Sequence, residues 1–202
     1  MRFLIYGSRS FARTVTALIE SCGHQVLGML DDYSPTAPGV LGTFEDACRN
    51  HSRAAVVMAL AIGYNDLDAR WRAWQRIRAA DWQTPSLVHP RAWIAPSARV
   101  GVGSLVMAGA IVDRDASLGE ACVLWPGACI NHDAQIGANT FISPNSTICG
   151  NAIVGANSFI GAAAVVVDGA LLPDRSFVKM GSAYTQRAPM GPVKDIYPPA
   201  AK

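Results

Sequence analysis

Histidine is the side chain best suited to move protons near neutral pH, and this chain has only four: His24, His51, His89 and His132. His132 differs from the others because Asp133 follows it directly, inside the regularly repeating second half of the sequence. A carboxylate beside an imidazole orients the ring and favours its cationic form, which suits a general base. The pair therefore predicts proton-transfer chemistry at His132, with an ordinary surface histidine as the alternative.

A second candidate site lies near the start of the chain, where a glycine turn joins a predicted strand to a predicted helix and two acids end the next strand. Units of the βαβ type hold nucleotides with this order, because the helix N-terminus offers N–H groups to phosphate and the acid reaches a ribose hydroxyl. The turn departs from GxGxxG at Arg9, so a plain strand-to-helix connection is an equal alternative. The candidate nucleotide-binding residues are Gly7, Ser8, Arg9, Ser10, Asp31 and Asp32.

The elements that would position His132 follow from a period of six residues. Every sixth position from Val88 to Val178 carries Val, Ile or Leu, and a small residue stands four positions after each. A helix repeats at 3.6 residues and a strand at 2, whereas a parallel β-helix built of hexapeptides repeats at six. Glycine also recurs every eighteen residues, so three hexapeptides close one coil of triangular section. These glycines are Gly101, Gly119, Gly137 and Gly155.

The eighteen-residue coil also predicts the neighbours of His132. His132 lies two residues after the inward-pointing Ile130 and is therefore expected at a corner or on an outer face. Arg114 would lie one coil before it and Gly150 one coil after it. Further polar groups flank these positions, namely Asp113, Asp115, Asn131 and Asp133.

The first half of the chain predicts an α/β unit, since apolar runs of strand length alternate with segments of helical period. Thr43 is expected to cap its second helix. The expected strands cover residues 2–6, 25–29 and 54–62, and the expected helices cover residues 11–21, 43–51 and a segment that starts at 65.

The last of these helices is amphipathic. One face carries Leu67, Trp71, Trp74 and Ile77. Four arginines fall largely elsewhere and predict a solvated face. They are Arg70, Arg72, Arg76 and Arg78.

Length and composition limit the classes of function. The 202 residues suit two domains, which we place at residues 1–85 and 86–186, followed by a tail at 187–202. A net charge of +2 offers no basic patch for nucleic acid. The longest apolar run, 54–62, is too short to cross a bilayer, so we expect a cytoplasmic protein without membrane insertion. With 16% charged residues, the flat faces of a β-helix cannot all be kept charged, which favours an oligomer.

Six short segments follow one another in an order typical of one protein family. They are Gly7–Arg13, Asp31-Asp32, Val40–Thr43, Ile62–Asn65, His89-Pro90 and Asn131-His132-Asp133. Together they resemble the bacterial nucleotide-sugar acetyltransferases of the sialic acid O-acetyltransferase type, which include UDP-4-amino-sugar N-acetyltransferases. The resemblance covers about residues 1–186.

The resemblance implies a fold and an activity. The fold is a Rossmann-like sugar-nucleotide domain joined to a left-handed parallel β-helix, and the assembly is a homotrimer with acetyl-CoA between neighbouring β-helices. The activity is transfer of an acetyl group from acetyl-CoA to an amino or hydroxyl group of a nucleotide-linked sugar. No metal is implied.

The resemblance also implies roles for single residues. His132 is the base, Asp133 orients its ring, and the Gly150 N–H stabilises the oxyanion. The turn from Gly7 to Ser10, with Asp31 and Asp32, holds the nucleotide sugar. The residues implied for acetyl-CoA are Gly150, Gly161, Gly181 and Ser182, the last two within the loop Met180–Ala183.

Two other functions stay open on this scaffold. Members of the family often carry a second histidine nine residues after the base, where this chain has Phe141. Because Phe141, Phe159 and Phe177 are eighteen residues apart, they predict a stacked aromatic column. Phe141 and Arg9 leave room for a catalytically altered sugar-nucleotide-binding or assembly protein. A γ-carbonic-anhydrase-like zinc enzyme would need three histidines, and the β-helix carries two.

Overall fold

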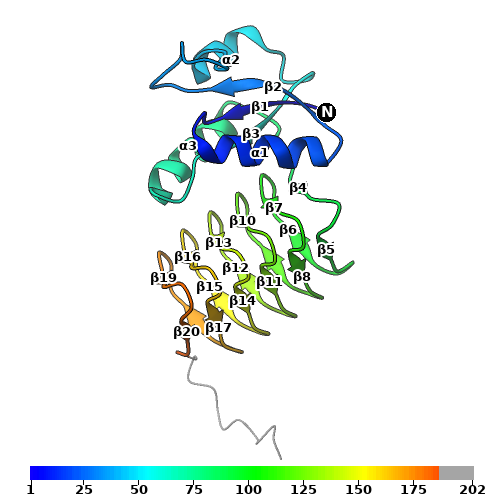
Figure 1. The fold of residues 1–202 in the computed structure, drawn as a ribbon, viewed down its shortest axis with the longest axis vertical. Coiled ribbons are helices and arrows are strands. Elements are labelled where there is room, and N and C mark those ends of the chain that lie inside the picture. Colours follow the sequence, from blue (N-terminus) through cyan, green and yellow to red (C-terminus); the bar gives the residue numbers. More distant parts are fainter. Residues whose placement is uncertain (187–202) are drawn as a thin grey trace, which may run out of the picture.

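The computed structural model describes residues 1–186, and the expected tail at 187–202 lies outside the described residues. The chain forms a small α/β unit followed by a parallel β-helix, as Figure 1 shows. The three strands of the α/β unit form a parallel sheet in the order β2-β1-β3. Its elements are β1 (Arg2–Tyr6), α1 (Ser10–Ser21), β2 (Gln25–Leu30), α2 (Phe44–Asn50), β3 (Val57–Leu60) and α3 (Leu67–Ala79).

Two elements of the α/β unit differ from the sequence prediction by two or more residues. The third strand is shorter than residues 54–62, because the Ala55 and Val56 N–H groups turn back to the Ser52 carbonyl before β3 begins. The last helix starts after Asp66, whose side chain accepts a hydrogen bond from the Ala69 N–H at 2.7 Å. The predicted cap at Thr43 is confirmed, since its hydroxyl accepts from the Asp46 N–H, and the Asp46 side chain accepts in return from the Thr43 N–H, which completes a capping box.

The prediction that the arginines of α3 form a solvated face is wrong for Arg70. Its side chain is fully buried, and its guanidinium donates to the Ile62 carbonyl at 3.0 Å and to the Ala121 carbonyl at 2.7 Å. It also donates to the side chain of Asn139 and lies over the Phe141 ring, 5.1 Å from the centroid. Burial lowers the pKa of Arg70 to about 10, so the group remains a cation at neutral pH. The arginine joins α3 to the β-helix.

The β-helix consists of two-residue strands in three parallel sheets. The β4 sheet contains β4 (Leu87–Val88), β7 (Leu105–Val106), β10 (Val123–Leu124), β13 (Phe141–Ile142), β16 (Phe159–Ile160) and β19 (Phe177–Val178). The β5 sheet contains β5 (Trp93–Ile94), β8 (Ile111–Val112), β11 (Cys129–Ile130), β14 (Thr147–Ile148), β17 (Val165–Val166) and β20 (Ala183–Tyr184). The β6 sheet contains β6 (Arg99–Val100), β9 (Ser117–Leu118), β12 (Gln135–Ile136), β15 (Ile153–Val154) and β18 (Leu171–Leu172).

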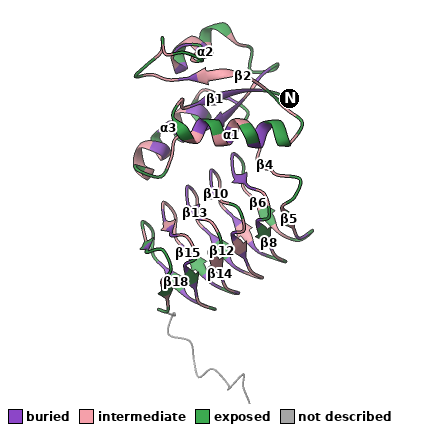
Figure 2. Cartoon of the chain, viewed as in Figure 1, coloured by how far each residue is buried: buried purple, intermediate pink, exposed green. Residues whose placement is uncertain are grey.

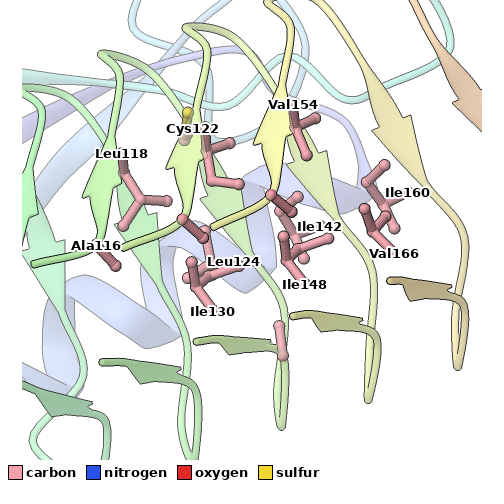
Figure 3. Close-up of a cluster of buried hydrophobic side chains, with 14 of the residues drawn as sticks. Ala116, Leu118, Cys122, Leu124, Ile130, Ile142, Ile148, Val154, Ile160 and Val166 are labelled. Atoms are coloured by element: carbon pink, nitrogen blue, oxygen red, sulfur yellow. The ribbon is translucent and has the colours of Figure 1, made fainter. Parts of the chain in front are cut away.

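The hexapeptide register is confirmed at every predicted aliphatic position, because each is the second residue of a strand and contributes to the interior. Figure 3 shows these side chains meeting inside the coils. Strands pair at a spacing of eighteen residues, as in Ile130 with Ile148. Each fully buried aliphatic side chain stabilises the coil by roughly 1.5–3 kcal/mol, which explains why the register tolerates no exception.

The α/β unit packs on the outward side of the β4 sheet. Leu105, Val123 and Phe141 point out of that sheet and are buried in one cluster with Val15 of α1. In Figure 2 both β1 and β7 carry the colour of buried residues. The α/β unit also contacts the turn that follows the β6 sheet, where the Ala121 carbonyl accepts a hydrogen bond from Arg70. The turn between the β5 and β6 sheets lies opposite these contacts across the three-sided coil (Figure 1).

Candidate functional site

A cavity of about 550 Å³ opens where β1, β2 and β3 end, beside the N-terminus of α1. All six residues predicted to bind a nucleotide line this cavity. Its volume lies in the range of small-molecule pockets. In open α/β sheets, ligands bind outside the carboxyl ends of the strands, at the point where the strand order reverses. Here that point lies between β1 and β3. The chain passes from β1 to β2 on one side of the sheet and then crosses to β3 on the other side of β1.

The turn after β1 depends on the absence of a side chain at Gly7. Its φ of 123° lies in a region that L-residues rarely adopt. A β-carbon on Gly7 would lie 2.6 Å from the Ala61 carbonyl oxygen, so only glycine lets the turn pass this close to the chain that leaves β3. The Gly7 N–H meanwhile donates to the Leu30 carbonyl at 2.9 Å, which ties the turn to β2.

The N-terminus of α1 faces the cavity without a capping side chain. Arg9 stands at the N-cap in an extended conformation and makes no side-chain cap, and both Arg9 and Ser10 are exposed. The first N–H groups of a helix attract anions. The turn with Arg9 therefore presents N–H groups and a guanidinium to the cavity, in place of the bare glycine backbone of GxGxxG.

The two acids after β2 have different surroundings. Asp31 accepts hydrogen bonds from the Ser8 hydroxyl and from the N–H groups of Tyr33 (2.8 Å) and Ser34 (3.1 Å). Although partial burial opposes ionisation, these bonds lower the pKa of Asp31 below its ordinary value. Asp31 thus remains ionised beside the helix N-terminus and shapes the turn that closes one side of the cavity.

Asp32 is held more firmly by the protein itself. It accepts from the Tyr6 hydroxyl, from Arg76 and, at 2.8 Å, from the Phe44 N–H at the start of α2. Burial again opposes ionisation, and these three donors lower the pKa of Asp32. Burial together with Asp32 raises the pKa of Tyr6, so the phenol stays protonated. Both carboxylates thus accept three hydrogen bonds, but those of Asp31 come from Ser8 and from its own turn, whereas those of Asp32 join it to β1, α2 and α3.

Sequence reasoning missed several polar residues that line the same cavity, including Asn65, Asp66 and Arg72. They come from the segment after β3 and from the first turns of α3. The rule that all parallel strands end at one edge of the sheet could have placed the post-β3 segment there. Tyr33, which is almost fully exposed at the rim, carries no such signal.

The predicted base lies at the turn between the β5 and β6 sheets. We call this part of the surface the His132 corner. On successive coils it consists of Arg114-Asp115, His132-Asp133, Gly150-Asn151 and Asp168-Gly169. The His132 Nδ1 lies 2.9 Å from the Asp133 carboxylate, and both side chains are about two-fifths exposed, at 42% and 39%. Arg114 lies 3.4 Å from the same carboxylate. Asp133 adopts a φ of 60°, close to the 58° of Asp115 and the 56° of Asn151 at the same turn of the neighbouring coils.

Gly150 lies directly under the imidazole. A β-carbon there would lie 2.7 Å from His132 Nε2, so only glycine lets the ring rest on the next coil. Coil stacking fixes the arrangement, because the Asn151 N–H donates to the His132 carbonyl at 3.1 Å. Within residues 1–186 the Gly150 N–H donates no hydrogen bond. An unused N–H beside a histidine is the geometry that stabilises an oxyanion next to a base.

Of the residues implied for acetyl-CoA, Gly150 lies at the His132 corner, whereas Gly161, Gly181 and Ser182 lie at the corner between the β4 and β5 sheets. Gly161 is buried against the backbone of Met180, and the Gly181 N–H donates to the Ala162 carbonyl at 2.8 Å. Along the chain, this corner comes just before a strand of the β5 sheet, whereas the His132 corner comes just after one. The outward face of that sheet includes Trp93 (52% exposed) and Ile111 (39%). Gly161 and His132 therefore border an apolar, open face on its two edges.

Phe141 does not line the cavity. It is fully buried between Phe11 and Tyr64 of the α/β unit, with ring centroids 5.8 and 5.7 Å away. The predicted column is confirmed in register, since Phe141 pairs with Phe159 and Phe159 with Phe177 along the β4 sheet. The rings of Phe159 and Phe177 stack at 5.4 Å, whereas Tyr64 contacts both Phe141 and Phe159. Phe141 thus packs the contact between the two units.

Two further observations concern a bound metal ion and a membrane. Among the described residues, no group of three His, Cys, Asp or Glu side chains is arranged to hold a metal ion. None of the helices up to residue 186 is long and apolar enough to cross a membrane.

Comparison with known proteins gives this geometry a context. Residues 133–168 match the family described as bacterial transferase hexapeptide (six repeats). A comparison with curated proteins finds no match. Among solved structures, the acetyltransferase domain of PglB from Neisseria gonorrhoeae FA1090 is 25% identical with a TM-score of 0.85, and 93% of each chain is covered. That domain has also been solved in complex with acetyl coenzyme A, with a TM-score of 0.84 over 92% of this chain and 91% of that chain.

PerB from Caulobacter crescentus, in complex with CoA and GDP-perosamine, is 26% identical with a TM-score of 0.84. The match covers 93% of this chain and 90% of PerB. The chain is similar to both proteins along nearly its whole length. The resemblance to nucleotide-sugar acetyltransferases stated from the sequence is thereby confirmed.

Proposed function

We propose that this protein transfers an acetyl group from acetyl-CoA to an amino or hydroxyl group of a nucleotide-linked sugar. The observation that carries the proposal is the likeness to PerB, solved with CoA and GDP-perosamine, over 93% of this chain. The open cavity beside α1 and the pair His132-Asp133 supply the two kinds of site that such a reaction needs.

In the proposed reaction the N–H groups at the start of α1 and the Arg9 side chain bind the diphosphate, and Asp31 accepts from the nucleoside. His132 Nε2 accepts the proton of the sugar nucleophile while the nucleophile attacks the thioester carbon. Asp133 holds the ring by its other nitrogen and offsets the positive charge that the ring gains. The Gly150 N–H stabilises the oxyanion until the C–S bond breaks, and His132 then returns the proton to the thiolate.

We also propose that the protein acts as a homotrimer in which one active site uses two chains. The cavity belongs to the unit that packs on the β4 sheet, whereas the His132 corner lies on the opposite side of the coil. A sugar bound in the cavity of one chain therefore needs the corner of a neighbour. The apolar outward face of the β5 sheet, bordered by Gly161 and His132, suits the acetyl-CoA channel once a neighbour covers it.

Three finer assignments belong to the same proposal. We assign the α/β unit to the Rossmann-like class, because its strand order β2-β1-β3 is that of a doubly wound sheet around its switch point. We assign the β-helix to the left-handed type and place the two domains at residues 1–85 and 86–186. We expect a cytoplasmic protein, since nucleotide sugars and acetyl-CoA are cytoplasmic metabolites.

Thiol release tests the activity directly. Acetyl-CoA is mixed with the protein and with UDP-, dTDP-, GDP- and CMP-linked amino and hydroxy sugars, and free CoA is measured. At least one acceptor should give release well above the rate without acceptor. Release that never depends on an acceptor, in a protein that still binds the nucleotide sugar, would favour the catalytically altered binding protein.

A mixing experiment tests the shared site. Ser10→Asp should abolish nucleotide binding by placing a negative charge at the start of α1, where it stabilises the helix and repels phosphate. His132→Ala should abolish the base. Equal amounts of the two inactive variants, unfolded and reassembled together, should regain about a quarter of wild-type activity if each site takes its cavity and its corner from different chains. No recovery would place both parts of the site in one chain.

A further inference from the structure

Asp168 lies one coil after Gly150, just as His132 lies one coil before it. The stacking is fixed by backbone hydrogen bonds, because the Gly169 N–H donates to the Gly150 carbonyl at 2.9 Å. Gly150 is buried although it belongs to a surface turn, since side chains from both neighbouring coils cover it. Sequence reasoning named only the residues eighteen positions from His132, and one further step of eighteen would have found Asp168.

Two hydrogen-bond acceptors meet over Gly150. A β-carbon at this position would lie 2.7 Å from His132 Nε2 and 3.0 Å from Asp168 Oδ1. The two atoms are therefore at most about two hydrogen-bond lengths apart. His132 Nδ1 faces Asp133 and carries the ring proton in the neutral form, so Nε2 presents a lone pair. Within the described residues Asp168 Oδ1 accepts no hydrogen bond and forms no ion pair.

Within residues 1–186, Arg114 of this corner does not neutralise Asp168. Arg114 lies two coils earlier than Gly150 and is occupied by Asp115 at 3.1 Å and Asp133 at 3.4 Å. Cys149 lies next to Gly150, and burial raises the pKa of its thiol, so it stays neutral. Among the described residues, the gap over Gly150 thus has an acceptor nitrogen on one side and a carboxylate without an ion pair on the other.

A nucleophile in this gap must donate two hydrogen bonds to satisfy both acceptors. A primary amine has two N–H groups, whereas a hydroxyl has a single O–H. A hydroxyl would leave either the base or the carboxylate without a partner, and an unmade bond to a charged group is costly. We propose that Asp168 binds the attacking amine and selects an amino sugar over a hydroxy sugar as acceptor, an inference that rests on the proposed acetyl transfer.

The step is balanced without a further reactant. The amine donates one N–H to His132 Nε2 and one to Asp168 Oδ1 while its lone pair attacks the carbonyl carbon of acetyl-CoA. An amide C–N bond forms and the C–S bond breaks. The first proton passes to Nε2 and then to the CoA thiolate, and the second stays on the amide nitrogen. The carboxylate offsets the positive charge that nitrogen carries between attack and proton loss.

Matched acceptors test the assignment. GDP-perosamine and its UDP- and dTDP-linked 4-amino counterparts are each compared with the same nucleotide sugar carrying a 4-hydroxyl group. Asp168→Asn should lower kcat/KM for the amino sugar by about tenfold to 100-fold, because a neutral amide replaces the charged acceptor and no longer offsets the positive charge on the nitrogen. Activity with the hydroxy sugar should change less than about threefold on the same reasoning. Affinity for CoA should not change.

Asp174→Asn is the control, because it removes one exposed carboxylate at a different corner while its amide oxygen can still accept from the Ala156 N–H. It should leave the ratio of amino-sugar to hydroxy-sugar activity as in the wild type. An unchanged ratio in Asp168→Asn, or a wild type that prefers the hydroxy sugar, would overturn the role of Asp168 alone. Absence of thiol release with every acceptor in the wild type would instead overturn the proposed function and this inference with it.

Discussion

The cavity of the α/β unit and the His132 corner are both rich in charge, yet they are built in opposite ways. At the cavity, Asp32 is enclosed by donors from β1, α2 and α3. At the corner, within residues 1–186, the His132 ring has one partner, Asp133, and the N–H of Gly150 beneath it donates no hydrogen bond. The lining groups of the cavity are thus held by other protein groups, whereas the corner keeps groups that the described residues leave without a partner. Binding and chemistry should therefore respond to different substitutions.

The largest effect should follow the loss of the base. His132→Ala should lower kcat by about 10² to 10⁴, because proton removal matters only in the transition state. Nucleotide-sugar affinity, measured by calorimetry, should stay as in the wild type, since the cavity lies in the other unit. His51→Ala is the control, because His51 ends α2 and lines neither site. Full activity of His132→Ala would remove the corner from the reaction.

A smaller loss should follow from filling the space over Gly150. Gly150→Ala keeps the backbone N–H but places a β-carbon 2.7 Å from His132 Nε2, so the ring must move. Misplacement of a catalytic group by about 1 Å costs on the order of 10²-fold in rate. Steady-state kinetics should show this loss in kcat with little change in the midpoint of thermal unfolding. Wild-type kcat would mean that the ring's place on Gly150 has no importance.

The two acids of the cavity should separate binding from stability. Asp31→Ala should weaken nucleotide-sugar binding by about 1.5–3 kcal/mol, because Asp31 both shapes the turn and can accept from the ligand. Asp32→Ala removes the acceptor of Tyr6, Arg76 and the Phe44 N–H, so its main effect should be a fall of about 1–3 kcal/mol in the free energy of unfolding.

Urea unfolding and calorimetry on both variants measure the two quantities side by side. CoA affinity should be unaffected in each. Equal losses of binding in both variants, with unchanged stability, would contradict the distinction between a ligand-facing and an internally committed carboxylate.

The smallest effect is a dependence of stability on pH. Folding lowers the pKa of Asp31 and Asp32, and hydrogen bonds from Thr43 lower the pKa of Asp46 to about 2. A carboxyl group with a lowered pKa adds stability above its unfolded pKa of about 4, and this stability is lost as pH falls through the folded value. Thermal unfolding should therefore move to lower temperature between about pH 4 and pH 2. Asp32→Asn should flatten that decline, whereas an unchanged profile would show that Asp32 contributes none of it.

Much of the β-helix could be predicted from the sequence because its rule is local and repeated. The period of six specified which residues point inward, and the period of eighteen placed Arg114 and Gly150 on the coils next to His132. Each strand pairs with the strands eighteen residues before and after it. A wrong register at one coil would therefore also appear at the next coil.

The contact between the two units could not be predicted in this way. Arg70 looks like a solvated residue in the sequence, since its burial depends on Ala121 and Asn139, far along the chain. The different partners of Asp31 and Asp32 likewise depend on where α2 and α3 come to lie. No period links these positions, and neighbouring acids look equivalent until the donors around them are known.

The burial of Arg70 has a consequence for exchanging parts between such proteins. A guanidinium that spans from Ile62 to Ala121 and Asn139, and lies over Phe141, requires matching groups on both units. A chimera that places residues 1–85 on the coils of a relative would bring a buried cation to a surface not shaped for it. Transplantation of the α/β unit should therefore succeed only when the coil positions equivalent to Ala121, Asn139 and Phe141 are transplanted with it, which makes these few residues part of the module although they lie outside its boundary.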